Sequence, residues 1–180
     1  MTRAAIFGPG SWGTAFAMVL ADSGTEPVLC SRRAELAQRI EAEHENPDYL
    51  PGIRLPDAVR ATTDPAAALS GAEFLVLALP AQNLRENLAR WAPLVAPHTV
   101  FVSLIKGIEL GTCLRMSQVI GEVTGAGPDR IAVVSGPNLA REIAERHPAA
   151  AVVACADRTV AERLQKACHS PYYRPTPTPT

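Results

Sequence analysis

The fold is decided by Gly8-Pro9-Gly10-Ser11-Trp12-Gly13, a stretch of the form G-x-G-x-x-G. It follows an apolar run, Ala4 to Phe7, and leads into a helix predicted over Thr14 to Ser23. In a dinucleotide-binding fold the first glycine allows a tight turn, the second lets the backbone approach a pyrophosphate, and the third lets helix pack on strand. Free amides and the positive helix end then hold the anion. The stretch predicts nucleotide binding rather than a structural turn, with Trp12 open between cofactor contact and plain packing.

Short apolar runs alternate with longer amphipathic runs along the rest of the chain. This alternation predicts an α/β fold of βα units, a three-layer, Rossmann-like, doubly wound and mainly parallel sheet. Further strands are predicted over Pro27 to Cys30, Val59 to Thr62, Phe74 to Leu79, Val100 to Leu104, Ile131 to Val134 and Ala150 to Ala154. Further helices are predicted over Ala34 to Glu45, Ala81 to Leu94, Leu114 to Thr124, Leu139 to Arg146 and Thr159 to Cys168.

Two segments lack this periodicity. Asn46 to Pro56 is rich in proline but keeps apolar residues, which predicts a packed surface loop. The end of the chain, residues 171–180, turns into Thr-Pro repeats. Proline removes amide donors and favours extended backbone, so we expect a disordered or polyproline-like tail outside the core. The predicted organisation is one nucleotide-binding domain over residues 1–170, followed by this tail.

The composition excludes several classes of function. The 180 residues carry 17 basic and 18 acidic side chains, which gives no field to attract nucleic acid or an anionic membrane. The four cysteines are scattered, without the spacing of a zinc site or a disulfide framework, so we expect no metal. No apolar run approaches the roughly 18 residues that span a bilayer. We therefore expect a cytoplasmic protein.

The residues after the second predicted strand bear on the choice of cofactor. An acidic residue is expected there if the ribose 2′-hydroxyl of NAD is bound. The chain instead reads Cys30-Ser31-Arg32-Arg33. A hydroxyl and two guanidinium groups suit a 2′-phosphate, which favours NADP(H) while leaving NAD(H) possible. The alternative is that Ser31 caps the next helix and both arginines are solvated.

Candidate substrate residues follow two later strands, at the edge of a parallel sheet where ligands bind. Lys106 comes directly after an apolar run, and burying an unpaired ammonium is costly, so we expect it to meet a ligand. The alternative is a lysine that reaches solvent. Gly136 and Asn138 lie in a Gly-Pro-Asn turn that offers free amides to an oxygen-rich ligand, unless Asn138 only caps a helix.

Several stretches in this order carry a family resemblance. They are Gly8 to Ala15, Asn46 to Gly52, Ala61 to Asp64, Lys106 to Glu109 and Ser135 to Asn138. Together they resemble the bacterial-type NAD(P)-dependent glycerol-3-phosphate dehydrogenases, over nearly the whole chain. The resemblance implies hydride transfer between nicotinamide and the secondary carbon of glycerol 3-phosphate, whose oxidised partner is dihydroxyacetone phosphate. Biosynthetic members of that family supply the glycerol phosphate of membrane phospholipids.

The resemblance also implies roles for residues at the cofactor. By position, Ser11 and Trp12 contact the dinucleotide, Arg32 and Arg33 hold its adenosine phosphate, and Tyr49 lies against it.

On the substrate side, the resemblance implies that Lys106 lies between cofactor and substrate as a catalytic residue. Gly136 and Asn138 touch the substrate, and Ala140 borders the dinucleotide.

One departure from the family pattern concerns the end of the chain. In that family a helical second domain follows the position of Arg174, and it carries the principal catalytic lysine and the arginine that holds the substrate phosphate. Thr-Pro repeats occupy this position here. We therefore expect a cofactor-binding half with little turnover of its own, and homodimers among full-length members. Two alternatives stay open: a non-catalytic NADP(H)-binding module, and a related reductase with another small substrate.

Overall fold

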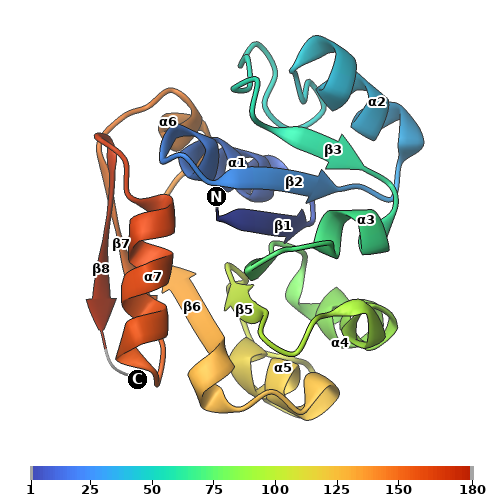
Figure 1. Cartoon of the computed structure of the whole chain (residues 1–180), viewed down its shortest axis with the longest axis vertical. Coiled ribbons are helices and arrows are strands. Elements are labelled where there is room, and N and C mark those ends of the chain that lie inside the picture. Colours follow the sequence, from blue (N-terminus) through green and yellow to red (C-terminus); the bar gives the residue numbers. More distant parts are fainter. Residues whose placement is uncertain (1, 179–180) are drawn as a thin grey trace.

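The fold is a single sheet covered by helices, and the computed structural model describes residues 2–178 (Figure 1). Within this range the sheet has eight strands in the order β3-β2-β1-β4-β5-β6-β7-β8. The strands are β1 (Arg3–Phe7), β2 (Glu26–Cys30), β3 (Arg60–Thr62), β4 (Phe74–Leu77), β5 (Val100–Ser103), β6 (Ile131–Ser135), β7 (Ala149–Ala154) and β8 (Tyr173–Thr178).

Helices connect most of the strands. The α-helices are α1 (Ser11–Asp22), α2 (Ala34–Glu43), α3 (Pro65–Leu69), α4 (Leu84–Trp91), α5 (Met116–Thr124), α6 (Ala140–Ala144) and α7 (Arg158–Cys168). Short 3-10 turns lie at η1 (Ala81–Asn83), η2 (Ala92–Leu94) and η3 (Pro128–Arg130). Each predicted strand and helix coincides with an observed one within a few residues. The helix predicted over 81–94 is divided into η1, α4 and η2, and the sequence reading missed α3.

The sheet is mainly parallel, as predicted. The chain runs from β1 outward through β2 to β3, then crosses to the other side of β1 and continues through β4, β5 and β6. Only the β6–β7 pair is antiparallel among the described strands. Strand order therefore reverses between β1 and β4, which is where a doubly wound sheet opens a crevice for ligands at its carboxyl edge.

Alternating side chains of the strands feed two separate cores, which makes three layers. Ala4 and Ile6 of β1 join the core under α1, α6 and α7, whereas Ala5 and Phe7 join the core under α3, α4 and α5. In the second core, the rings of Phe7 and Trp91 pack at right angles, in a T-shaped arrangement, with their centroids 4.5 Å apart. Apolar runs buried on both faces are what a sheet between two helical layers requires. The predicted three-layer α/β class is confirmed.

The end of the chain differs from the prediction of a disordered tail. Residues 173–178 form β8, which pairs in parallel with β7, so the sheet continues across the predicted boundary at residue 170. Tyr173 is fully buried, and its ring centroid lies 6.2 Å from that of Phe16. Residues 179–180 of the predicted tail lie outside the described residues.

β8 can pair with β7 despite its prolines because they occupy every second position of an edge strand. At the two ends of the pairing, Ala149 N donates to Tyr172 O and Cys155 N donates to Thr178 O. In a parallel ladder only every second residue of β8 directs its backbone N–H and C=O groups toward β7. The prolines are the residues between them, opposite Ala151 and Val153. Their missing amides therefore face away from the ladder, where proline is tolerated.

The helices are short relative to the thickness of a membrane. Within residues 2–178 none is both long enough and apolar enough to cross a bilayer.

Candidate functional site

The glycine loop between β1 and α1 is held by close packing. Gly8 has a φ of +109°, and a Cβ there would lie 2.3 Å from the backbone oxygen of Ala78, at the end of β4. A Cβ on Gly13 would lie 2.1 Å from the oxygen of Gly8. A Cβ on Gly10 meets nothing within 4 Å. The first and third glycines thus bring loop, strand and helix together, while the second leaves the loop open on its outer side.

The N-terminus of α1 is free of competing groups. Its N-cap is Gly10, without a side-chain hydrogen bond, and its first turn holds no acidic residue. The amides of Ser11 and Trp12 begin the helix, where backbone N–H groups have no intrahelical acceptor. Such a terminus attracts a phosphate through its amides and its dipole. The loop and helix end therefore fit a pyrophosphate.

A cleft of about 500 Å³ lies beside this loop, next to the ends of β1, β2 and β4. It lies where strand order reverses, as expected for a ligand crevice. Gly13 is buried and does not line the cleft. Of the predicted cofactor residues, the cleft wall contains Gly8, Gly10, Ser11, Trp12, Arg32, Arg33 and Tyr49.

The loop predicted over residues 46–56 closes one side of this cleft. Its anchor is Asn46, fully buried, whose Nδ2 donates to Pro9 O at 2.9 Å and to Thr14 Oγ1 at 2.7 Å. Ser11 Oγ donates to Tyr49 O at 3.0 Å. The 46–56 loop is therefore hydrogen-bonded to the glycine loop at Pro9 and at Ser11, on either side of Gly10. Sequence reasoning assigned no role to Asn46, the first residue of the Asn46 to Gly52 stretch that carries part of the family resemblance.

The residues after β2 differ from one another in their availability. Ser31 is buried, and its Oγ exchanges 3.0 Å hydrogen bonds with the backbone N and O of Arg33. The N-cap of α2 is Arg33, so Ser31 does not cap that helix. The guanidinium of Arg33 pairs with Asp48 of the 46–56 loop. Arg32 is exposed and forms no ion pair or hydrogen bond with the other described residues.

Cys30 lines the same cleft, and burial raises the pKa of its thiol to about 11, with a smaller contribution from Asp64. The thiol is therefore neutral near pH 7 and is a poor nucleophile.

Lys106, Gly136 and Asn138 meet at the ends of β5 and β6. Lys106 Nζ donates to Gly136 O at 3.2 Å. A Cβ on Gly136 would lie 2.7 Å from Ala150 O and 2.8 Å from Asn138 Nδ2, so only glycine fits there. Both amide atoms of Asn138 are shielded from solvent and lack a hydrogen-bond partner in the part of the chain that the structure describes. Unpaired buried polar atoms are costly, and a ligand would satisfy them.

The structure contradicts the argument for Lys106 from the cost of burial, and it also contradicts the alternative that Asn138 only caps a helix. Lys106 is exposed in a loop beyond the end of β5, so the cost of burying its charge does not apply. Asn138 is not a helix cap, since the N-cap of α6 is Leu139. Ala140 is the first residue of α6 and does not line the 500 Å³ cleft.

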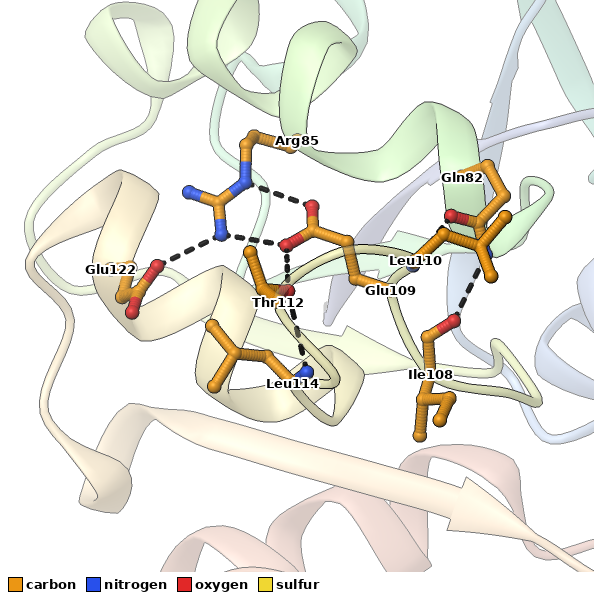
Figure 2. Close-up of polar contacts among 8 residues, drawn as sticks. All are labelled: Gln82, Arg85, Ile108, Glu109, Leu110, Thr112, Leu114 and Glu122. Atoms are coloured by element: carbon orange, nitrogen blue, oxygen red, sulfur yellow. Dashed lines mark hydrogen bonds and ion pairs between the residues drawn. The ribbon is translucent and has the colours of Figure 1, made fainter.

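The segment that follows Lys106 is fastened to η1 and α4 (Figure 2). Arg85 makes a two-pronged contact with Glu109, at 2.8 and 2.9 Å, and also reaches Glu122. Gln82 accepts from Leu110 N and donates to Ile108 O, each at 2.9 Å.

The same contacts control the charge of Glu109. Hydrogen bonds from Arg85, and a smaller one from Thr112, lower the pKa of Glu109 to about 2. The carboxylate is thus charged throughout the neutral range. This network, which sequence reasoning missed, fixes the backbone that carries Lys106.

A larger cavity of about 610 Å³ lies between α5 and the strands β5 and β6. Its walls include Ser103, Met116 and Val133, but no residue of the glycine loop and none of the Lys106, Gly136 and Asn138 cluster. The 500 Å³ cleft is therefore the candidate cofactor site.

Comparison with known proteins agrees with this geometry. A family model described as the NAD-dependent glycerol-3-phosphate dehydrogenase N-terminus matches residues 3–161. The chain belongs to this family. Two relatives named glycerol-3-phosphate dehydrogenase [NAD(P)+] are similar over 173 residues, one from Streptomyces avermitilis at 64% identity and one from Streptomyces griseus at 66%. Each alignment covers 96% of this chain and 52% of the relative.

Solved structures of the glycerol-3-phosphate dehydrogenase family share the fold. The enzyme from Coxiella burnetii matches with a TM-score of 0.90 and 32% identity, over 98% of this chain and 54% of that one. The enzyme from Dunaliella salina matches with a TM-score of 0.87 and 28% identity, over 98% of this chain and 33% of that one. The chain spans about half the length of the curated relatives it matches.

Proposed function

We propose that this chain is the cofactor-binding half of a glycerol-3-phosphate dehydrogenase, and that it binds NADP(H) in preference to NAD(H). The observation that carries the proposal is the glycine loop. Its first and third glycines have no room for a side chain, its second faces open space, and the uncapped start of α1 lies beside the cleft. Membership of the family supports the same reading.

The residues of the cleft divide the work of holding the dinucleotide. The amides at the start of α1, from Ser11 onward, hold the pyrophosphate. Trp12 and Tyr49 flank the cleft with aromatic surface, and Tyr49 is held by Ser11. Arg32 and Arg33 lie at the end where the adenosine ribose binds. When bound, the nicotinamide accepts or supplies the hydride at the secondary carbon of the substrate.

The cluster of Lys106, Gly136 and Asn138 receives a small phosphorylated substrate, glycerol 3-phosphate or dihydroxyacetone phosphate. The ammonium of Lys106 stabilises negative charge on the substrate oxygen at the reacting carbon. The unpartnered amide of Asn138 offers one donor and one acceptor to substrate hydroxyl groups. Gly136 leaves the space in which Asn138 lies, and it orients Lys106 through its carbonyl.

We also propose a cytoplasmic location and, for the full-length enzyme, a homodimer that feeds phospholipid synthesis. Cys30, Cys113, Cys155 and Cys168 are all free thiols, which suits a reducing compartment.

The test is a calorimetric titration of the purified chain with NADPH and with NADH, paired with an assay of dihydroxyacetone phosphate reduction on the same sample. Trp12 and Trp91 both line the cleft, so their fluorescence reports binding independently. We expect both nucleotides to bind, NADPH more tightly, without appreciable turnover. Failure of both nucleotides to bind a folded sample would refute the proposal. Clear turnover would show that a second domain is not needed.

A further inference from the structure

Arg33 lies at the end of the cleft to which the proposed function assigns the adenosine, and it forms an ion pair with Asp48, which lies next to the cleft residue Tyr49 but does not itself line the cleft. We propose that Asp48 is a specificity-determining residue, which holds Arg33 away from a 2′-phosphate and thereby weakens the preference for NADPH over NADH. The inference rests on the proposed function, because it assumes that a dinucleotide occupies this cleft.

The first step concerns which groups are free to meet a 2′-phosphate. Sequence alone offers a hydroxyl and two guanidinium groups, but the structure engages two of the three. Ser31 is buried and turned toward the backbone of Arg33. Arg33 lines the cleft, yet its guanidinium is paired with Asp48. Within residues 2–178, only Arg32 of this group carries no competing contact.

The second step concerns why Asp48 stays where it is. It lies two residues after Asn46, which is buried and bonded to the glycine loop at Pro9 O and Thr14 Oγ1. It lies one residue before Tyr49, whose carbonyl accepts from Ser11 Oγ. The backbone on both sides of the carboxylate is therefore fixed to the wall of the cleft. If a phosphate displaces Asp48 from Arg33, the fixed backbone therefore keeps the carboxylate of Asp48 close to that phosphate.

The third step is electrostatic. A phosphate monoester carries about two negative charges at neutral pH, so it is repelled by Asp48 and competes with it for Arg33. The 2′-hydroxyl of NADH carries no charge and leaves the pair intact. The side chains of Arg33 and Asp48 are 54% and 33% exposed, and ion pairs at such exposure are weak. The phosphate can therefore break the pair at modest cost, so that both cofactors bind.

The test compares nucleotide affinities of the full chain before and after the change Asp48→Asn, by calorimetry with NADPH and NADH. Removing the competing charge releases Arg33 and ends the repulsion. We expect NADPH to bind about twofold to fivefold more tightly, the upper part of the range that one exposed ion pair can supply, while the affinity for NADH does not change. A circular dichroism melt verifies that the variant is folded.

Two further variants make the result specific. Asp57→Asn removes another exposed carboxylate near this loop, which pairs with Arg54 at 3.0 Å and does not line the cleft, and it should leave both affinities unchanged. Arg33→Gln should weaken NADPH binding alone. In the Arg33→Gln background, Asp48→Asn should no longer tighten NADPH binding through the release of Arg33. Only the gain from ending the direct repulsion between Asp48 and the 2′-phosphate should remain.

The outcomes separate this inference from the proposed function. If the wild-type chain binds both nucleotides and Asp48→Asn leaves their ratio unchanged, only the role of Asp48 is overturned. Equal shifts for NADPH and NADH would also overturn it, because they would indicate an effect on the loop rather than on the 2′-phosphate. If the folded wild-type chain binds neither nucleotide, the proposed function itself fails.

Discussion

At the scale of single residues, the glycines of the G-x-G-x-x-G motif are required for different steric reasons. Gly13 has no room for a methyl group because its Cβ would overlap the oxygen of Gly8. Gly10 has room within the protein, and its Cβ would point into open space beside the cleft. The first demand belongs to folding and the second to the ligand.

Gly13→Ala and Gly10→Ala should therefore fail in different ways. Overpacking in Gly13→Ala should lower the free energy of unfolding by about 1–3 kcal/mol. Gly10→Ala should unfold nearly as the wild type does, but bind NADPH at least about tenfold more weakly, because the methyl group keeps the pyrophosphate from the backbone. Urea unfolding and calorimetry measure the two effects. Equal stability loss in both variants would contradict this division.

The motif could be predicted because its rule is local, whereas its support could not. Gly8, Gly10 and Gly13 lie within six consecutive residues, and their spacing alone predicts nucleotide binding. The contacts of Asn46 with Pro9 and of Arg33 with Asp48 join residues 37 and 15 positions apart through an irregular loop. No periodicity specifies such contacts, so the pairing of Arg33 with Asp48 could not be predicted from the sequence.

At the scale of elements, the segment after Lys106 is attached to η1 and α4 by side-chain hydrogen bonds and an ion pair. Arg85 and Gln82 hold it at Glu109, Ile108 and Leu110 (Figure 2). Glu109 is the centre of this attachment, and its carboxylate is stabilised by Arg85 and Thr112.

Glu109 should make the stability of the fold depend on acid. Its pKa is lowered from 4.5 in the unfolded chain to about 2 in the folded one, so its contribution is complete above pH 4.5 and is lost as the pH falls toward 2. Wild type should therefore lose its stability advantage over Glu109→Gln across this interval. Thermal melts at stepped pH measure it, with Glu86→Gln, an exposed carboxylate on α4, as control. A constant difference between wild type and Glu109→Gln would contradict the assignment.

At the scale of the whole molecule, the order of strands and helices followed from sequence, but the edge of the sheet did not. Apolar runs such as Phe74–Leu77 are strands because both faces are buried, and this signal lies in composition. β8 has no such signal, and its Thr-Pro repeat resembles a disordered tail. Its pairing depends on where β7 lies, which only the tertiary fold determines.

The alternation of threonine and proline in β8 can be tested by moving a proline by one position. By the alternation of hydrogen bonds between β7 and β8, the backbone N–H of Thr176 points toward β7, whereas the backbone nitrogen of Pro177 points away from it. Thr176→Pro should therefore remove a ladder donor and lower the free energy of unfolding by about 1–3 kcal/mol. Pro177→Ala, one residue further, should change it little. Urea unfolding of both variants decides the matter, and equal effects would exclude the assigned alternation.

The burial of Tyr173 against Phe16 has a consequence for the order of events during synthesis. Phe16 belongs to α1, the helix that presents the glycine loop, and Tyr172 Oη donates to Asp22 of the same helix at 2.8 Å across 150 positions of sequence. Until residues 172 and 173 have been synthesised, one side of α1 lacks its cover. The residues that line the 500 Å³ cleft all lie between positions 8 and 91, but α1 packs completely only once residue 173 has left the exit tunnel.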